Sequence, residues 1–224
     1  MFQGFTDRTF EFFMAIKFNN NRQFFHENHD WYEEAVRLPM KDLAADLSDT
    51  IDSLDPELET RPEKVVSRIN RDIRFSNDKS PYRDYMWLAF RKPGLDRKIT
   101  LGAYFDISCQ GASFGAGIYN EHKPYMNGLR QQLLTREEEF LSAWLPVKDE
   151  FQLFGTRFKR MEIPSQLSPE TAEWYPLRGF YVEKDIPDFD LLCSPQLTDF
   201  LREGFERLKP LYHFLRDIPE IDSL

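Results

Sequence analysis

The spacing of apolar residues changes along this chain, and that change limits the possible folds more than any other feature of the sequence. Up to about residue 60, apolar side chains such as Phe10, Phe13 and Met14 recur every three or four positions, the period of an amphipathic helix. From Val65 the period becomes two, which is typical of β-strands, and helical spacing returns after Pro124. Helices and strands segregated along the chain in this way predict an α+β fold.

Capping residues predict where the N-terminal helices begin. Thr6, followed by Asp7, is expected to begin the first helix, because a side-chain oxygen can accept hydrogen bonds from the free N–H groups of the first turn. The run of asparagines at 19–21 ends this helix and offers an N-cap for a second one. Pro39 suits the first turn of a third helix.

Residues 65–76, 85–91, 98–108, 113–119 and 178–186 have strand-like patterns. The second of these stretches, YMWLAFR, is continuously apolar, which predicts a central strand buried on both faces. Gly111 lies between the third and fourth stretches and predicts a hairpin turn there. Gly115 and Gly117 indicate a bulge or a close approach of another backbone.

The remaining patterns complete a single α+β domain over residues 1–224. Thr135 and Glu138 have the spacing of a capping box, and Ser194 with Pro195 is expected to begin a long terminal helix. The sheet is expected to be mostly antiparallel or mixed, with N-terminal, middle and C-terminal helices packed on it. We predict a helical lead-in over residues 1–60, a sheet core with a basic segment over 61–120, and helices plus a late strand over 121–224.

The charge balance excludes several partners. With 29 Lys and Arg against 38 Asp and Glu, the chain has a formal net charge of -9, which disfavours nucleic acids and membrane surfaces as partners. Cys109 and Cys193 match no metal or redox spacing, and such sparse cysteine use fits a reducing compartment. The N-terminal residues resemble neither a signal peptide nor a membrane span, so we expect a cytoplasmic protein.

No motif predicts a metal, a cofactor or a reaction. His26 and His29 are one residue too close for the H-E-x-x-H metalloprotease pattern, and a solvated polar face is the simpler interpretation. The sequence contains neither a Gly-x-Ser-x-Gly nucleophile motif nor a Walker phosphate loop. Whether the protein is an enzyme stays open, with no catalytic residue identified.

One basic segment stands out in this acidic chain. Residues 67–84 read SRINRDIRFSNDKSPYRD, in which five basic residues and three aspartates give a local charge of +2. Alternation would place Arg71 between Ile69 and Ile73 on one face of a strand. Because an arginine cannot lose its proton, a guanidinium in this position needs an anionic partner, either in the fold or in a ligand.

This segment also resembles the signature of a family of uncharacterised proteins, domain of unknown function number twenty-four sixty-one. The resemblance extends over nearly the whole chain and implies a single α+β domain without an established activity. Residues outside the segment that are similar to family features are Asn20, Asn21, Phe24, Phe25, Tyr32, Gly117, Tyr119, Met126, Arg130 and the run 158–161.

Two functional hypotheses follow. In the first, an arginine-rich cleft binds a small phosphate- or carboxylate-bearing ligand, and several guanidinium groups supply paired donors for its oxygens. Its candidate ligand-binding residues are Arg68, Arg71, Asp72, Arg74, Lys79, Tyr82, Tyr119 and Arg130. Within this set, Arg71, Arg74 and Lys79 would neutralise the ligand. In the second, the protein is a non-catalytic interaction module, and the Arg/Asp network only stabilises the fold.

Overall fold

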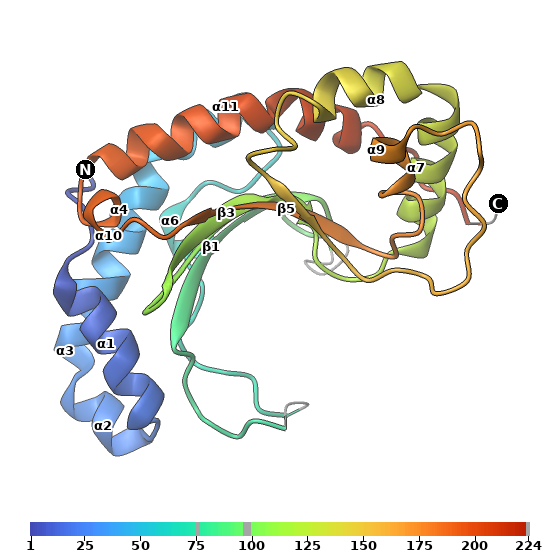
Figure 1. Cartoon of the computed structure of the whole chain (residues 1–224). Helices are drawn as coiled ribbons and strands as arrows, with labels where there is room; N and C mark the ends of the chain where they lie inside the picture. The colour runs from blue at the N-terminus through green and yellow to red at the C-terminus, as the bar shows by residue number, and fades with distance from the viewer. Residues whose placement is uncertain (75–76, 96–99, 223–224) are drawn as a thin grey trace.

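The protein is built on an arched, antiparallel sheet with helices at its ends and along its outer side (Figure 1). The structure is a computed structural model that describes residues 1–74, 77–95 and 100–222. The strands are β1 (Tyr85–Arg91), β2 (Gly102–Ser108), β3 (Gly111–Ile118), β4 (Gln152–Phe154) and β5 (Phe180–Ile186). Over the described ranges their order is β1-β2-β3-β5-β4, and every pair is antiparallel. The predicted α+β class is confirmed.

Helices precede and follow the sheet. Before it come α1 (Asp7–Phe18), α2 (Arg22–Glu27), α3 (His29–Tyr32), a π-helical turn (Glu33–Arg37), α4 (Leu38–Asp46), α5 (Ser48–Leu54) and α6 (Pro62–Val65). The later helices are α7 (Lys123–Thr135), α8 (Glu137–Trp144), α9 (Pro169–Ala172), α10 (Phe189–Leu192) and α11 (Gln196–Arg216). None of the helices in the described part of the chain is long and apolar enough to cross a membrane.

The predicted caps of the N-terminal helices are confirmed. Thr6 is the N-cap of α1, and its N–H donates to the side chain of Thr9 at 3.2 Å. The side chain of Asn21 caps α2 by accepting from the N–H of Phe24 at 2.9 Å. Pro39 lies in the first turn of α4, as its missing N–H favours.

The β2–β3 hairpin follows the glycine pattern. Its loop is formed by Cys109 and Gln110, and Gly111 adopts a positive φ of 129°, which favours glycine. A Cβ atom added to Gly115 would lie 1.8 Å from the carbonyl oxygen of Val182 on the neighbouring strand. The close backbone approach predicted for this glycine is therefore present between β3 and β5.

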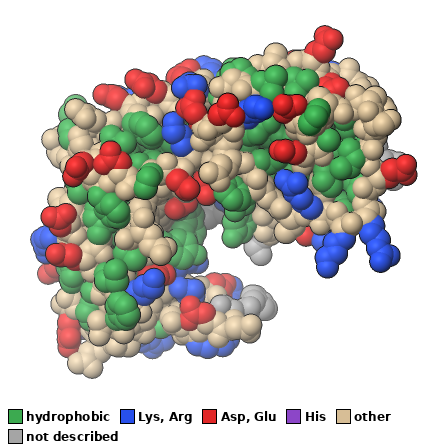
Figure 2. Space-filling view, viewed as in Figure 1, with side chains coloured by type: hydrophobic (Ala, Val, Ile, Leu, Met, Phe, Trp, Pro, Cys, Tyr) green, Lys and Arg blue, Asp and Glu red, His purple; other side chains and the backbone are tan. Residues whose placement is uncertain are grey.

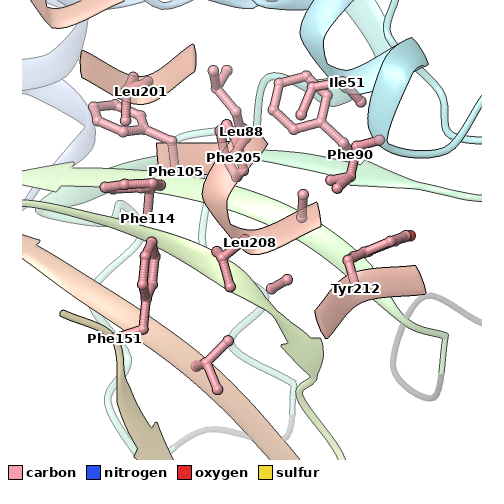
Figure 3. Packing of buried hydrophobic residues seen from close by; sticks show 14 of the residues in the cluster. Ile51, Leu88, Phe90, Phe105, Phe114, Phe151, Leu201, Phe205, Leu208 and Tyr212 are labelled. Atoms are coloured by element: carbon pink, nitrogen blue, oxygen red, sulfur yellow. The ribbon is translucent and has the colours of Figure 1, made fainter. Parts of the chain in front are cut away.

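One hydrophobic core joins the outer side of the sheet to α11. Phe105 and Phe114 point from the sheet toward Leu201 and Phe205 of the helix (Figure 3). A Cβ atom on Gly204 would lie 2.3 Å from the ring of Phe114, so this glycine lets α11 pack closely on β3. Burial of these aromatic and aliphatic side chains is the main stabilising contribution, at roughly 25 cal/mol per Å² of apolar surface.

The strand predicted over residues 65–76 does not form, and Phe75 and Ser76 lie outside the described residues. Helix α6 occupies the start of this range, and residues 66–74 make only the isolated bridges Val66–Leu88 and Asn70–Tyr82. Two backbone hydrogen bonds, Arg71 N to the Pro81 carbonyl and Arg83 N to the Ile69 carbonyl, close the segment on itself. An irregular loop results because its backbone groups pair within the loop and with side chains rather than along a neighbouring strand.

Two further expectations were wrong. β1 is an edge strand whose burial alternates along its length, so its apolar run does not mark a strand buried on both faces. Tyr85 and Trp87 are only partly covered on its second face. Thr135 does not cap α8, because it is the last residue of α7 and its hydroxyl donates to the carbonyl of Gln131 at 2.9 Å.

Candidate functional site

Arg71, the central residue of the predicted anion site, is bound by its own segment. Nη1 lies 2.9 Å from the carboxylate of Asp78, and Nη2 lies 3.8 Å from that of Asp84. Nε donates to the carbonyl of Tyr82 at 3.4 Å, and the side chain is only 21% exposed. The fold itself therefore supplies the anionic partner that this guanidinium needs.

The other cations of the segment are engaged locally or face solvent. Arg74 forms a two-point contact with Asp72, with Nη2 at 2.7 Å, and this guanidinium lowers the pKa of the Asp72 carboxyl. Lys79 donates to the carbonyl of Ile73 at 2.8 Å. Arg68 is exposed and forms no ion pair with any described residue.

Tyr82 belongs to the core and does not line a rim. Its side chain is 7% exposed, and its ring stacks on Phe25 with centroids 4.2 Å apart. The side chain of Asn20 fixes its backbone from both sides, donating to the carbonyl and accepting from the N–H of Tyr82 at 3.0 Å each. These two bonds attach the 67–84 segment to the turn between α1 and α2.

Tyr119 and Arg130 lie away from the 67–84 segment. Tyr119 follows β3 and is 76% exposed, with its ring 6.3 Å from that of Tyr181. Arg130 is buried in α7, which Figure 1 shows at the opposite end of the molecule from the segment. The structure thus brings Arg71, Asp72, Arg74 and Lys79 together but not these two residues.

A second set of polar residues lies on the side of the sheet that α11 does not cover. Side chains alternate between the two faces of a strand, and Phe105, Phe114 and Val182 point toward the helix. We call the opposite face the inner face. It carries Trp87, Tyr104, Asp106, Ser113, Tyr181, Glu183 and Asp185. Figure 2 shows the molecule hollowed between the end with α7–α9 and the end with α1–α3.

Hydrogen bonds across β3 connect the inner-face residues. The hydroxyl of Tyr104 donates to Glu183 at 2.7 Å, reaching over Gly115, which lies between them in the register and has no side chain. The hydroxyl of Ser113 donates to Asp106 at 2.8 Å. These bonds hold two carboxylates from β2 and β5 in fixed positions.

The carboxylates of the inner face have no positive partner within the described part of the chain. Asp106, Glu183 and Asp185 form no ion pair with any residue that the structure describes. Burial, together with the charges of Glu183 and Asp185, raises the pKa of Asp106 to about 6, against the opposing hydrogen bond from Ser113. Burial and the Glu183 charge also raise the pKa of Tyr104 well above its usual range. Asp106 is therefore partly protonated near neutral pH, as desolvation predicts.

Two cavities follow β5 on this side of the sheet. One has a volume of about 460 Å³ and is lined by the inner-face residues Asp106, Ser113, Glu183 and Asp185 with the β2–β3 turn. The other has a volume of about 650 Å³ and is lined by Tyr119, Phe154 and Tyr181 with neighbouring loop residues. Inward-facing neighbours on a strand are about 7 Å apart, so the two cavities adjoin between Tyr181 and Glu183.

Aromatic rings flank the acidic residues on both sides. Phe154 stacks on Tyr181 with centroids 5.2 Å apart, and Tyr119 lies on the same ring. At the other edge of the sheet, Arg83 from the basic segment lies 4.8 Å from the ring of Trp87. The basic segment thus borders the inner face at β1.

An alternating pattern in the sequence indicates the residues of the inner face, although the charge distribution along the chain does not. In GAYFDIS and FYVEKDI, polar or aromatic residues alternate with apolar ones, and that alternation places Tyr104 and Asp106 on one face and Tyr181 and Glu183 on the matching face. The pairing of β5 with β3 was not evident from the sequence. In residues 1–74, 77–95 and 100–222, no group of three or more His, Cys, Asp or Glu side chains could hold a metal ion.

Comparison with known proteins gives one result. A family model described as "Conserved hypothetical protein (DUF2461)" matches residues 8–214. No curated protein and no solved structure matches the chain.

Proposed function

Because the chain belongs to the DUF2461 family of conserved hypothetical proteins, a description that names no reaction, we propose a function from the site itself: the inner face binds a small organic cation. The observation that carries this proposal is the set of three carboxylates, Asp106, Glu183 and Asp185, on adjoining parts of the sheet without a cationic partner in the described chain. A protonated amine would supply that partner.

The energetic argument starts from the cost of burying charge. A carboxylate removed from water without a counter-charge is penalised, and the raised pKa of Asp106 expresses this penalty. A cation that binds between Asp106 and Glu183 would favour the ionised form of Asp106. The bound cation and the deprotonated form of Asp106 therefore stabilise each other. The affinity of the inner face for the cation should increase as the pH is raised past about 6.

The aromatic residues suit the rest of such a ligand. The faces of Tyr181, Phe154 and Tyr119 can pack on flat or alkyl groups, and an ammonium group is attracted to aromatic faces by about 0.5–2 kcal/mol. Arg83 over Trp87 is an internal example of this contact. Cavities of about 460 and 650 Å³ fit small molecules rather than polymers.

Thermal unfolding with matched probes tests the proposal. We expect 2-phenylethylamine, but not the neutral 2-phenylethanol, to raise the unfolding midpoint of the protein. Glu183→Gln should remove this effect, because the amide can still accept from Tyr104 but carries no charge. The control Glu203→Gln removes an exposed carboxylate of α11 that has no ion pair among the described residues, and should leave the effect intact. An equal response to amine and alcohol would contradict the proposal.

The second candidate, a non-catalytic module stabilised by the 67–84 network, is supported by the contacts of Arg71 with Asp78 and Asp84. An anionic ligand at this segment stays a prediction. Its binding would have to compete with carboxylates that already neutralise Arg71 and Arg74. Arg68 is the exposed cation through which such binding can be tested.

A further inference from the structure

Arg130 is a buried cation without a carboxylate partner among the residues that the structure describes. Its side chain on α7 is 3% exposed, and no Asp or Glu in the described ranges lies within ion-pair distance of it. Nε donates to the carbonyl of Tyr175 at 2.9 Å, Nη1 donates to the side chain of Asn127 at 3.1 Å, and Nη2 donates to the carbonyl of Leu177. Each of its three nitrogens has a hydrogen-bond acceptor, but no described carboxylate neutralises its charge.

This arrangement is unfavourable for a residue with only a structural role. A guanidinium keeps its proton in proteins, so Arg130 stays charged even though burial lowers its pKa. Carbonyl and amide dipoles offset only part of the cost of removing a full charge from water. An uncharged side chain could bind the same carbonyl groups. The positive charge of Arg130 therefore favours an anion that is not part of the described chain.

Further cations surround Arg130 at the surface. The ring of Phe158 covers the guanidinium groups of both Arg130 and Arg178, at 5.5 and 5.2 Å. Arg178 pairs with Glu121, which also lines the larger cavity. The segment 156–161, TRFKRM, contains three basic residues and no acidic one. Figure 2 shows Lys and Arg side chains projecting at the lower right, where Figure 1 places the loop between β4 and α9.

Arg157, Lys159 and Arg160 are exposed, and the structure gives none of them an ion pair among the residues it describes. The local charge of this segment, +3, exceeds that of the 67–84 segment in a chain whose total is -9. A concentration of unpaired cations next to a buried guanidinium lowers the energy of a bound polyvalent anion.

We propose that the segment 156–161, together with Arg130 and Arg178, forms a binding site for a small free polyvalent anion with phosphate or carboxylate oxygens. Lys159, Arg160 and Arg178 contact the anion, and displacement of the half-exposed Phe158 ring brings it to Arg130. This site adjoins the larger cavity, which Thr156 and Glu121 also line, but none of its cations lies on the inner face that would hold the amine. A nucleic acid strand would present the same phosphate chemistry, but the acidic remainder of the chain repels a polymer.

Calorimetric titration with inorganic pyrophosphate tests this site, with a single-stranded oligonucleotide in a second arm. We expect saturable pyrophosphate binding to the parent protein. The variants Lys159→Gln and Arg160→Gln should each weaken it about tenfold, the effect of one lost charge-assisted contact. The control Lys17→Gln removes an exposed cation of α1 that makes no ion pair with any described residue, and it should not change the affinity. Phe158→Ala, which uncovers Arg130 without altering any charge, should retain or strengthen binding.

Three results would overturn the assignment. The first is no saturable binding of pyrophosphate, the second is an equal loss of affinity in Lys17→Gln and Arg160→Gln, and the third is tighter binding of the oligonucleotide than of pyrophosphate. Arg130→Gln extends the test if it folds, and is expected to abolish pyrophosphate binding. Because Lys159 and Arg160 are exposed, their variants keep the test decisive if Arg130→Gln does not fold. Failure of the amine experiment on the inner face would leave these outcomes unchanged.

Discussion

Substituting Asp106 by asparagine should stabilise the protein at alkaline pH. The folded environment raises the pKa of Asp106 from 3.8 to about 6. In the folded state at pH 8 the carboxylate is therefore ionised at a cost of about 3 kcal/mol relative to the unfolded chain. Asparagine carries no charge, and its carbonyl oxygen can keep the hydrogen bond from Ser113. Asp106→Asn should therefore avoid this ionisation cost and keep the hydrogen bond from Ser113.

The size of the effect depends on pH. Between pH 3.8 and about 6 the folded protein binds a proton that the unfolded chain does not, so the stability of the parent falls as pH rises through this window. We therefore expect Asp106→Asn to exceed the parent in free energy of unfolding by about 3 kcal/mol at pH 8 and by about half as much at pH 5. Urea denaturation of both proteins at the two pH values measures the difference.

The control for this measurement is Asp42→Asn, an exposed carboxylate of α4 that makes no ion pair with the described residues. Its stability relative to the parent should not vary between pH 5 and pH 8. A difference between Asp106→Asn and the parent that is the same at both pH values, or a variant less stable than the parent at pH 8, would refute the argument that Asp106 is a desolvated, uncompensated carboxylate.

Other substitutions test the remaining parts of the structure by urea denaturation. Arg71→Ala should lower the free energy of unfolding by about 1–3 kcal/mol, because Asp78 and Asp84 lose their partner; an unchanged value would mean that the network does not stabilise the fold. Asn20→Ala removes both bonds to the Tyr82 backbone and should cost about 2 kcal/mol, whereas a neutral effect would show that the segment does not need this attachment. Gly115→Ala should cost about 3 kcal/mol or more, because its Cβ would overlap the Val182 carbonyl; parent-like stability would contradict the close approach.

Local chemistry made much of the fold predictable. Asn21 caps α2 because its side chain accepts from a free N–H group of the first turn, an effect that depends on only a few neighbouring residues. Gly111 predicted the β2–β3 hairpin for the same reason, since the turn requires a positive φ. Features of this kind can be recognised in a sequence without knowing the tertiary structure.

Features set by distant partners were harder to predict. Whether YMWLAFR becomes a central or an edge strand depends on which strands pair beside it, and its apolar composition does not contain that information. The alternation in residues 65–76 is equally compatible with a strand and with a loop, and here the side chain of Arg83 donates to the backbone carbonyls of Arg68 and Asn70. Long-range hydrogen bonds decided between these conformations.

The candidate site was predictable only in part. The local charge of +2 favoured the 67–84 segment as an anion site, yet the fold pairs Arg71 and Arg74 with carboxylates of the same segment. The inner-face carboxylates come from β2 and β5, which are separated by more than 70 residues in the chain and face one another only across β3. Their lack of cationic partners is a property of the assembled sheet, and no local sequence pattern encodes it.

The indole signal of Trp87 tests the central claim, an inner-face cation site, most directly. Of the four tryptophans, Trp87 is the one opposite Asp106 in the β1–β2 register, whereas Trp144 and Trp174 are buried outside the sheet. In a titration of ¹⁵N-labelled protein with 2-phenylethylamine, we predict a saturable shift of the Trp87 indole N–H signal that is lost in Glu183→Gln. Unchanged Trp87 signals, or a shift that Glu183→Gln retains, would contradict the claim.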